Sequence, residues 1–277
     1  MTKDLNTILI PINNELTFIQ DDIFDSILSK VSLANEVSKY AIGSKGKRIR
    51  PAITLLCYKA ISEELVTPEI QNLACAIELI HTATLLHDDV IDEAEVRRGQ
   101  ESVNKKWSDK VSILSGDFLL AQGLLKISSL KNLEIIELFS SSLIEICEGE
   151  LFQISTLNTQ PTIEQYIKKS EQKTAKLFVL AACTPAIFLN QSQEIIENFK
   201  NYGKNLGIAF QIINDLKDTN SIDEKQGILN APQIIGVEKA KELACEYLSQ
   251  AKDSLKAIPD SIYKESLISL CDISILH

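Results

Sequence analysis

The chain has 277 residues, of which 45% are hydrophobic and 24% are charged, enough apolar material for one large domain with a buried core. Its net charge of −10 and its lack of a Lys/Arg-rich block argue against nucleic acid as the main partner, because phosphate backbones need neutralising cations. The N-terminus lacks the pattern of a signal peptide, and no apolar run approaches the roughly 20 residues of a membrane span. We therefore expect a cytoplasmic protein without a stable membrane anchor.

Glycine and proline are scarce and separate long stretches with helical periodicity. Only ten glycines and seven prolines occur, and between them apolar residues recur at i, i+3, i+4 and i+7 without sustained period-two alternation. The predicted helices cover 14–39, 68–95, 111–127, 132–154, 162–187 and 194–218. No internal repeat or linker divides the chain. We predict an all-α fold, a helical bundle that forms a single domain over residues 1–277.

The first cluster of cations follows the first predicted helix, in the glycine-containing segment Gly46-Lys47-Arg48-Ile49-Arg50-Pro51. Arginine matches phosphate oxygens bidentately, and lysine supplies a compact charge. Diphosphate binding is one interpretation, and ordinary solvated surface charge is the other. The same two interpretations apply to Arg97-Arg98-Gly99 and to Lys173-Thr174.

The second predicted helix begins at Thr67-Pro68, a typical N-cap followed by proline at the first helical position. It ends in Asp88-Asp89-Val90-Ile91-Asp92, where Asp88 and Asp92 lie one turn apart on the same face. Like charges at this spacing and negative charge near a helix C-terminus are both unfavourable. Binding of Mg²⁺ would relieve both penalties. A solvated acidic helix end is the alternative.

The last two predicted helices begin and end with further signals. A capping-box pattern at Thr162 to Gln165 starts the helix that carries Lys173-Thr174. The next helix ends in a second acidic segment, in which one face carries Gln211, Asn214, Asp215 and Asp218. Two helices with acidic terminal turns can face each other across a bundle and hold several metal ions between them.

The cysteines are scattered singly through apolar stretches, without CxxC or CxxH spacing. We expect six buried free thiols: Cys57, Cys75, Cys147, Cys183, Cys245 and Cys271.

Taken together, these motifs resemble those of the trans-polyprenyl diphosphate synthases, in the same order along the chain. The matching segments are GKRIRP at 46–51, IHTATLLHDDVID at 80–92, RRG at 97–99, GELFQ at 149–153, KTAKLF at 173–178 and GIAFQIINDLKD at 207–218. The resemblance implies an isoprenoid-synthase-type bundle around a deep central cavity, Mg²⁺ as cofactor, and a homodimer, for which apolar helices around 111–154 could supply the interface. It also implies condensation of isopentenyl diphosphate with an allylic diphosphate such as farnesyl or geranyl diphosphate.

The resemblance assigns roles by matching position. The residues implied to hold the diphosphate of isopentenyl diphosphate are Lys47, Arg50, His81 and Arg98. Those implied to hold the allylic diphosphate are Arg97, Lys173, Thr174 and Gln211. The implied metal ligands are Asp88, Asp92 and Asp215, with Asp89 supporting them indirectly. The implied catalytic set is Asp88, Asp89, Asp92, Arg97, Lys173, Gln211 and Asp215. His87 has apolar neighbours on its helix, so we expect a histidine that is packed or that supports a metal ligand, rather than a ligand itself.

Chain length is expected to depend on the residues one turn below the first aspartate, which are Ala83 and Thr84. Short-chain members of the family carry aromatic side chains there, which block the space for the growing hydrocarbon tail. Neither residue here is bulky, so a long-chain product is predicted.

Three features depart from the family pattern. Asn214 stands where the second motif normally starts with aspartate, and an amide brings no charge to a metal. The loop after Asp218 is short and lacks the usual Gly-Lys pair, for which Lys225 is a candidate substitute. The sequence ends at His277 without a basic tail, so looser closure over the site is expected.

Two other functions are alternatives. A non-catalytic or partner-dependent subunit of a heteromeric synthase would normally carry a degraded first motif, and this one is intact. A class I terpene cyclase would need Ser or Thr four residues after Asn214 and Glu eight residues after it, where this chain has Asp218 and Ile222. The chain also keeps Lys47 and Arg50, the cations for a second diphosphate.

Overall fold

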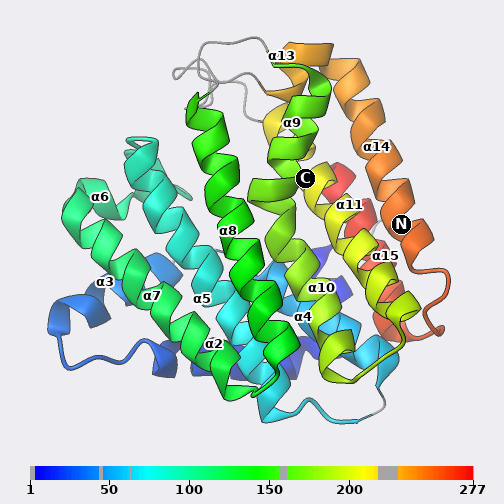
Figure 1. Cartoon of the computed structure of the whole chain (residues 1–277), viewed down its shortest axis with the longest axis horizontal. Helices are drawn as coiled ribbons and strands as arrows, with labels where there is room; N and C mark the ends of the chain where they lie inside the picture. Colours follow the sequence, from blue (N-terminus) through cyan, green and yellow to red (C-terminus); the bar gives the residue numbers. More distant parts are fainter. Residues whose placement is uncertain (1–3, 44–45, 63, 156–160, 218–229, 277) are drawn as a thin grey trace. The chain divides into compact units, whose positions relative to one another are not determined.

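The computed structural model describes residues 4–43, 46–62, 64–155, 161–217 and 230–276 (Figure 1). The chain forms two compact units, each assembled from separate segments. Unit 1 comprises Met1–Ile12, Leu56–Leu65 and Leu133–His277, and unit 2 comprises Asn13–Leu55 and Val66–Asn132. This division does not test the single-domain prediction, which stays a prediction.

Unit 2 contains helices that surround the long helix α5 (Pro68–Ile91) and a short hairpin that follows it. The other elements of unit 2 are α2 (Asn13–Ser26), α3 (Ser32–Gly43), the first part of α4 (Ile49–Ile61), β1 (Val96–Arg97), β2 (Gln100–Glu101), α6 (Val103–Lys106) and α7 (Asp109–Ser129). Helix α5 packs along α7, and the two lie side by side in Figure 1.

Two glycines of α7 bring it close to α5. A Cβ atom at Gly123 would lie 2.7 Å from Cγ1 of Ile80, and the imidazole of His87 covers Gly116. His87, Ile80 and Ala76 therefore mark the stripe of α5 that faces α7. This packing fixes the helix whose last turn carries the first acidic motif, and it confirms His87 as a packed histidine.

Helix α7 is long and apolar enough to cross a membrane by length and composition. The expectation that no segment reaches this length was wrong for α7. One third of its most apolar window is buried inside the protein, and its glycines pack on α5. The core helix of a globular protein passes the same test, so α7 alone is weak evidence for a membrane span.

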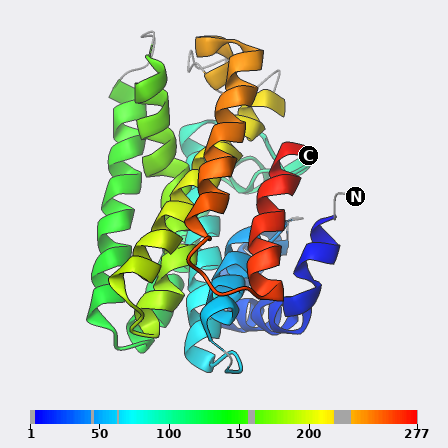
Figure 2. The same cartoon turned by 90° about the vertical axis from the view of Figure 1, so that its right-hand side faces the viewer.

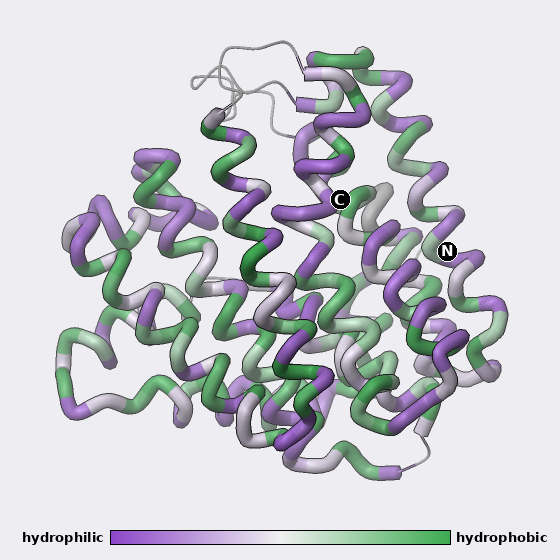
Figure 3. Tube along the Cα trace, in the orientation of Figure 1, coloured by the Kyte–Doolittle hydropathy of each residue, from purple (hydrophilic) through white to green (hydrophobic). Residues whose placement is uncertain are grey.

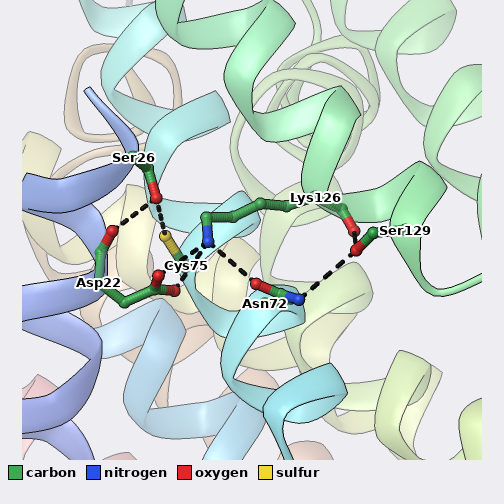
Figure 4. Close-up of polar contacts among 6 residues, drawn as sticks. All are labelled: Asp22, Ser26, Asn72, Cys75, Lys126 and Ser129. Atoms are coloured by element: carbon green, nitrogen blue, oxygen red, sulfur yellow. Dashed lines mark hydrogen bonds and ion pairs between the residues drawn. The ribbon is translucent and has the colours of Figure 1, made fainter. Parts of the chain in front are cut away.

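A polar network joins α2, α5 and α7 in unit 2 (Figure 4). The Lys126 ammonium donates to both carboxylate oxygens of Asp22 and to the side-chain oxygen of Asn72, each at 2.9 Å. Ser26 lies 3.8 Å from the buried thiol of Cys75 in the same network. These contacts satisfy polar groups between apolar helices and thereby fix their register.

The helix predicted over 14–39 is two helices, so that prediction was wrong. The chain leaves the helical conformation after Ser26, and the side chain of Asn35 closes the turn before α3. Its Oδ1 accepts a hydrogen bond from the Ser29 amide at 2.7 Å, and its Nδ2 donates to the Ser29 carbonyl at 2.8 Å. Such side-chain bonds offer the backbone an alternative to the helical ladder.

Unit 1 is built around α11 (Gln193–Lys217), which packs against α10 (Lys176–Phe188) and α14 (Val237–Ser254). Its remaining elements are α1 (Leu5–Leu9), η1 (Ile10–Ile12), the end of α4, α8 (Leu133–Ser155), α9 (Ile163–Ser170), the π-helical turn η2 (Glu171–Ala175), α13 (Ala231–Ile235) and α15 (Ile262–Leu276). Figure 2 shows α14 next to α11, and α15 next to the N-terminal α1.

Amphipathic patterns explain how these helices pack. Along α14, hydrophobic and hydrophilic residues alternate in the manner of a surface helix (Figure 3). The buried face of α14 consists of Ala240, Ala244, Leu248 and Ala251. Helix α15 contacts α1 through a hydrogen bond of 2.9 Å that the Ser266 hydroxyl donates to the Ile8 carbonyl.

Replacing Gly203 by alanine should destabilise unit 1. A Cβ atom at Gly203 would lie 2.5 Å from the Phe178 carbonyl oxygen and 2.7 Å from Cα of Val179, so α10 and α11 would have to separate. We expect a loss of about 1–3 kcal/mol in the free energy of unfolding, measured by urea titration. The matched control is Gly43→Ala, since nothing lies within 4 Å of a Cβ there. Equal stability of the two variants would contradict this account.

The all-α prediction is confirmed, and the helices predicted over 68–95, 111–127, 132–154 and 194–218 correspond to α5, α7, α8 and α11. Pro68 occupies the first turn of α5 as predicted, although the Thr67 hydroxyl makes no capping hydrogen bond.

The helix predicted over 162–187 begins with the expected capping box, and it includes the π-helical turn η2. The prediction of six buried thiols was wrong for two of them, because Cys147 and Cys245 are exposed.

Candidate functional site

The last turn of α5 presents the carboxylates of Asp88 and Asp92, both partly exposed. Among the described residues no group of three or more His, Cys, Asp or Glu side chains forms a closed metal site. Mg²⁺ does not need one, because it binds through one or two carboxylates and completes its shell with water and substrate phosphate. The donor set at Asp88 and Asp92 therefore fits this ion.

Asp89, between these two, points into unit 2 and holds Arg97. Its side chain is 3% exposed, and its Oδ1 accepts from Arg97 Nε at 2.6 Å and lies 2.5 Å from Arg97 Nη2. Burial raises the pKa of Asp89, while the charge of Arg97 and its hydrogen bond oppose that rise. Asp89 thus fixes the side chain of Arg97, and the indirect supporting role predicted for Asp89 stays a prediction.

The RRG motif forms the turn of the hairpin. Val96 pairs with Glu101, and Arg97 pairs with Gln100. Arg98 and Gly99 both have positive φ, 53° and 79°, as in the two-residue turns that match the twist of a hairpin. The hairpin therefore separates the two arginines, with Arg97 on Asp89 and Arg98 exposed at the turn.

Residues predicted to hold isopentenyl diphosphate come together in unit 2. Arg50 Nη1 lies 3.0 Å from Nε2 of His81, and Arg98 lies over Gly46, where a Cβ atom would be 2.7 Å from its Nη1. Lys47 is exposed in the same segment. Burial lowers the pKa of Arg50 to about 10, against the attraction of Glu78, so Arg50 stays charged at neutral pH.

His81 is held neutral. Burial, followed by the charges of Arg50 and Arg98, lowers its pKa well below the ordinary value of 6.5. Because arginine can only donate, His81 Nε2 accepts from Arg50. The unfolded chain binds a proton at this histidine below its ordinary pKa, while the folded protein does not. His81 therefore contributes stability above that pKa, and the contribution is lost as the pH falls.

His81→Gln should make stability less dependent on pH, because glutamine is polar but does not titrate. Between about pH 7 and about pH 5, we expect the free energy of unfolding of the wild type to fall more steeply than that of the variant. The difference in slope should reach up to about 1.4 kcal/mol per pH unit. Urea titrations across this range measure it, and parallel curves would contradict a neutral His81.

In unit 1, the π-helical turn brings Lys173 and Thr174 toward α8 and α11. Lys173 forms an ion pair with Glu150 of α8, and Thr174 Oγ1 donates to Oε1 of Gln211 at 2.8 Å. Gly149 permits the approach, since a Cβ atom there would lie 3.0 Å from Gln172. Single π-helical turns occur frequently at functional sites. Lys173, Thr174 and Gln211, which are predicted to hold the allylic diphosphate, thus lie in unit 1 with the second acidic motif.

Asp215 is the centre of a hydrogen-bond network inside unit 1. Its Oδ2 accepts from the Tyr166 hydroxyl at 2.6 Å and from the Ala231 amide at 3.3 Å, and its Oδ1 accepts from Gln211 Nε2 at 2.8 Å. The residue is 9% exposed. Burial raises the pKa of Asp215, and these donors oppose the rise. Protein donors thus surround the carboxylate in this structure, and the ligand role predicted for Asp215 stays a prediction.

The other positions named from the sequence are Asn214, Asp218, Lys225, Ala83 and Thr84. Asn214 is partly exposed near the end of α11. Asp218 and Lys225 lie outside the described residues. Ala83 is 1% exposed and lies, by helical spacing, on the stripe of α5 that faces α7. The Thr84 hydroxyl donates to the His81 carbonyl at 2.8 Å. Glu150 and Tyr166 carry no predicted role, although Glu150 lies in the matched segment at 149–153, whereas no motif includes Tyr166.

The sequence matches the Polyprenyl synthetase family over residues 31–229. The chain belongs to the polyprenyl synthetase family. Its members include a prenyl transferase of Cyanidium caldarium, 34% identical, with 94% of each chain covered. The octaprenyl diphosphate synthase of Escherichia coli is 37% identical over 77% of this chain and 68% of its own length. These relatives support a prenyltransferase rather than the non-catalytic alternative.

Solved structures of the family agree with the fold. A decaprenyl diphosphate synthase from Rhodobacter capsulatus has a TM-score of 0.93 at 26% identity, with 99% of each chain covered. A heptaprenyl diphosphate synthase from Staphylococcus aureus has a TM-score of 0.90 at 29% identity, covering 100% of this chain and 99% of that one. The protein is thus a prenyltransferase of a family that uses a divalent metal.

Proposed function

We propose that this polyprenyl synthetase condenses isopentenyl diphosphate with an allylic diphosphate, such as farnesyl or geranyl diphosphate, to make a long-chain trans-polyprenyl diphosphate. The observation that carries the proposal is the cluster of Arg50, Arg98 and the neutral His81 in unit 2, since His81 lies on the same helix as Asp88 and Asp92. Relatives named for octaprenyl and solanesyl products support the long chain. The small side chains of Ala83 and Thr84 support it further.

The metal in this proposal is Mg²⁺, with Asp88 and Asp92 as its ligands. When bound, it supplies Lewis-acid stabilisation of the charge that develops on the leaving diphosphate. Asp215 is assigned a different role, which is to orient Gln211 so that its amide oxygen accepts from Thr174. Within the second motif, Asn214 would offer an amide oxygen at the position where the family pattern has a carboxylate.

The chain's own residues hold the two anions in place. In unit 2, Arg97 is held by Asp89 and keeps further donors for a diphosphate. In unit 1, Thr174 and Gln211 are hydrogen-bonded to each other beside Lys173, and family resemblance assigns these three residues to the allylic diphosphate. Lys47, Arg50, His81 and Arg98 hold the diphosphate of the second substrate. His81 does so as a neutral hydrogen-bond partner, since burial and the arginines keep it deprotonated.

The reaction then follows from charge. The allylic C–O bond breaks with its electron pair on the departing diphosphate, and the cations near that diphosphate stabilise the charge. The double bond of isopentenyl diphosphate forms the new C–C bond, and the proton released goes to the departing diphosphate. No side-chain base is assigned.

Assembly and location belong to the same proposal. Leu114 and Leu125 of α7 are 67% and 65% exposed, and Ile144 and Leu151 of α8 are 60% and 65% exposed. A homodimer that covers such apolar helices is proposed, and light scattering tests it. A cytoplasmic location without a stable membrane anchor stays a prediction.

Consumption of labelled isopentenyl diphosphate by the purified protein tests the proposed reaction. Turnover should require an allylic diphosphate and Mg²⁺, and omission of either should abolish it. Turnover of an allylic diphosphate without isopentenyl diphosphate, giving a hydrocarbon, would instead indicate a cyclase.

A further inference from the structure

Arg48 differs from the other cations of its segment, because its guanidinium points into unit 2. Its side chain is 16% exposed, whereas Lys47 beside it is exposed. Its backbone has φ of 49°, a left-handed conformation that is uncommon for a residue with a side chain. A residue keeps such a conformation when its surroundings hold it there. The contacts of Arg48 supply that restraint.

The guanidinium of Arg48 reaches acceptors on three helices. Nη1 forms an ion pair with Glu78 of α5, Nη2 donates to the Ile42 carbonyl of α3 at 2.5 Å, and Nε donates to Oε1 of Gln20 of α2 at 3.2 Å. The fixed planar fork of arginine suits this geometry, and lysine cannot reproduce it. One side chain thus anchors the segment that carries Lys47 and Arg50.

Glu78 has a second function in the cluster. Its side chain is 4% exposed and lies one turn before His81 on α5. Its charge favours the protonated forms of Arg50 and Arg98, which burial and neighbouring arginines disfavour. The buried carboxylate of Glu78 therefore offsets the repulsion between Arg50 and Arg98 when no diphosphate is bound.

We propose that Arg48 and Glu78 form a positioning pair, which holds the segment at 46–50 on α5 so that Lys47, Arg50 and Arg98 are arranged for isopentenyl diphosphate before it binds. Neither member of the pair contacts the substrate in this proposal. The inference rests on the proposed function, because it concerns the site assigned to that substrate. It adds Glu78, which no motif marks, and it gives Arg48 a role other than the diphosphate contact considered for its segment.

Loss of the pair is expected to weaken binding of isopentenyl diphosphate selectively. Arg48→Met and Glu78→Gln should each raise KM for isopentenyl diphosphate about tenfold, with kcat at saturation and KM for the allylic diphosphate changed less than twofold. The double variant should resemble the single variants rather than show the product of their effects, because each single change already breaks the pair. General loss of structure would not separate the two substrates in this way.

Controls keep the inference distinct from folding and from the proposed reaction. Arg48→Lys keeps the charge but loses the planar guanidinium, so it should also raise KM for isopentenyl diphosphate. This variant tests the pair even if Glu78→Gln fails to fold. Lys105→Met breaks an exposed ion pair with Glu95 in the same unit and should change neither KM.

Isothermal titration with isopentenyl diphosphate alone gives a readout that does not depend on turnover. Weaker binding by the folded Arg48 variants than by the wild type supports the pair. Unchanged binding and unchanged KM in folded Arg48→Met and Arg48→Lys overturn it. Absence of turnover in the wild type would count against the proposed function instead, and the titration would still decide on the pair.

Discussion

Asp88→Ala should lower kcat about 1000-fold while the protein stays folded. The carboxylate is one of two metal ligands proposed on the last turn of α5, and losing one such group from the stabilisation of a leaving anion costs on the order of 10²–10³ in rate. The same change removes a like-charge neighbour of Asp92 and a negative charge near a helix C-terminus. Stability should therefore stay equal or rise by a few tenths of a kcal/mol.

Steady-state kinetics over a range of Mg²⁺ concentrations, together with thermal melts, measure both effects. The control is Asp117→Ala, which removes an exposed carboxylate from α7 in the same unit, and its kcat should stay within about twofold of the wild type. An Asp88→Ala protein with kcat near the wild-type value, or with a much lower melting temperature, would contradict a metal role for Asp88.

Asp215→Ala should destabilise the protein by roughly 3–6 kcal/mol. The change leaves three donors without their acceptor, namely the Tyr166 hydroxyl, the Gln211 amide and the Ala231 backbone N–H. Each buried donor left unsatisfied costs about 1–3 kcal/mol. For a chain of this size, the melting temperature should fall by about 10 °C.

The variant Asp215→Asn separates the two roles considered for this residue. It keeps the shape and one acceptor oxygen, so it should lose less stability than the alanine variant. If Asp215 orients Gln211, kcat should fall while the Mg²⁺ concentration needed for half-maximal rate stays the same. A large increase in that concentration would restore Asp215 as a metal ligand.

Much of the fold could be predicted because burial imposes a helical period on the sequence. Helices α5, α7, α8 and α11 follow from apolar spacing. The break between α2 and α3 could not, because it depends on the Asn35 side chain turning back to Ser29. Cys147 and Cys245 were misjudged because apolar neighbours along a helix do not determine which face a residue occupies.

The candidate site could also be predicted only in part. The spacing of Asp88 and Asp92 and the nearby cations could be recognised from residue types and order alone. The partner of each group could not. Only coordinates reveal that Asp89 holds Arg97, that Asp215 is surrounded by protein donors, and that Arg48 points at Glu78. A carboxylate in a motif can be a ligand or an internal anchor, and burial decides between them.

The most direct test of the central claim is the length of the product made from farnesyl diphosphate, labelled isopentenyl diphosphate and Mg²⁺. We predict a ladder of trans-polyprenyl diphosphates that ends in long chains and disappears in Asp88→Ala. A product that stops after one condensation, or no condensation at any Mg²⁺ concentration, would contradict a long-chain polyprenyl diphosphate synthase.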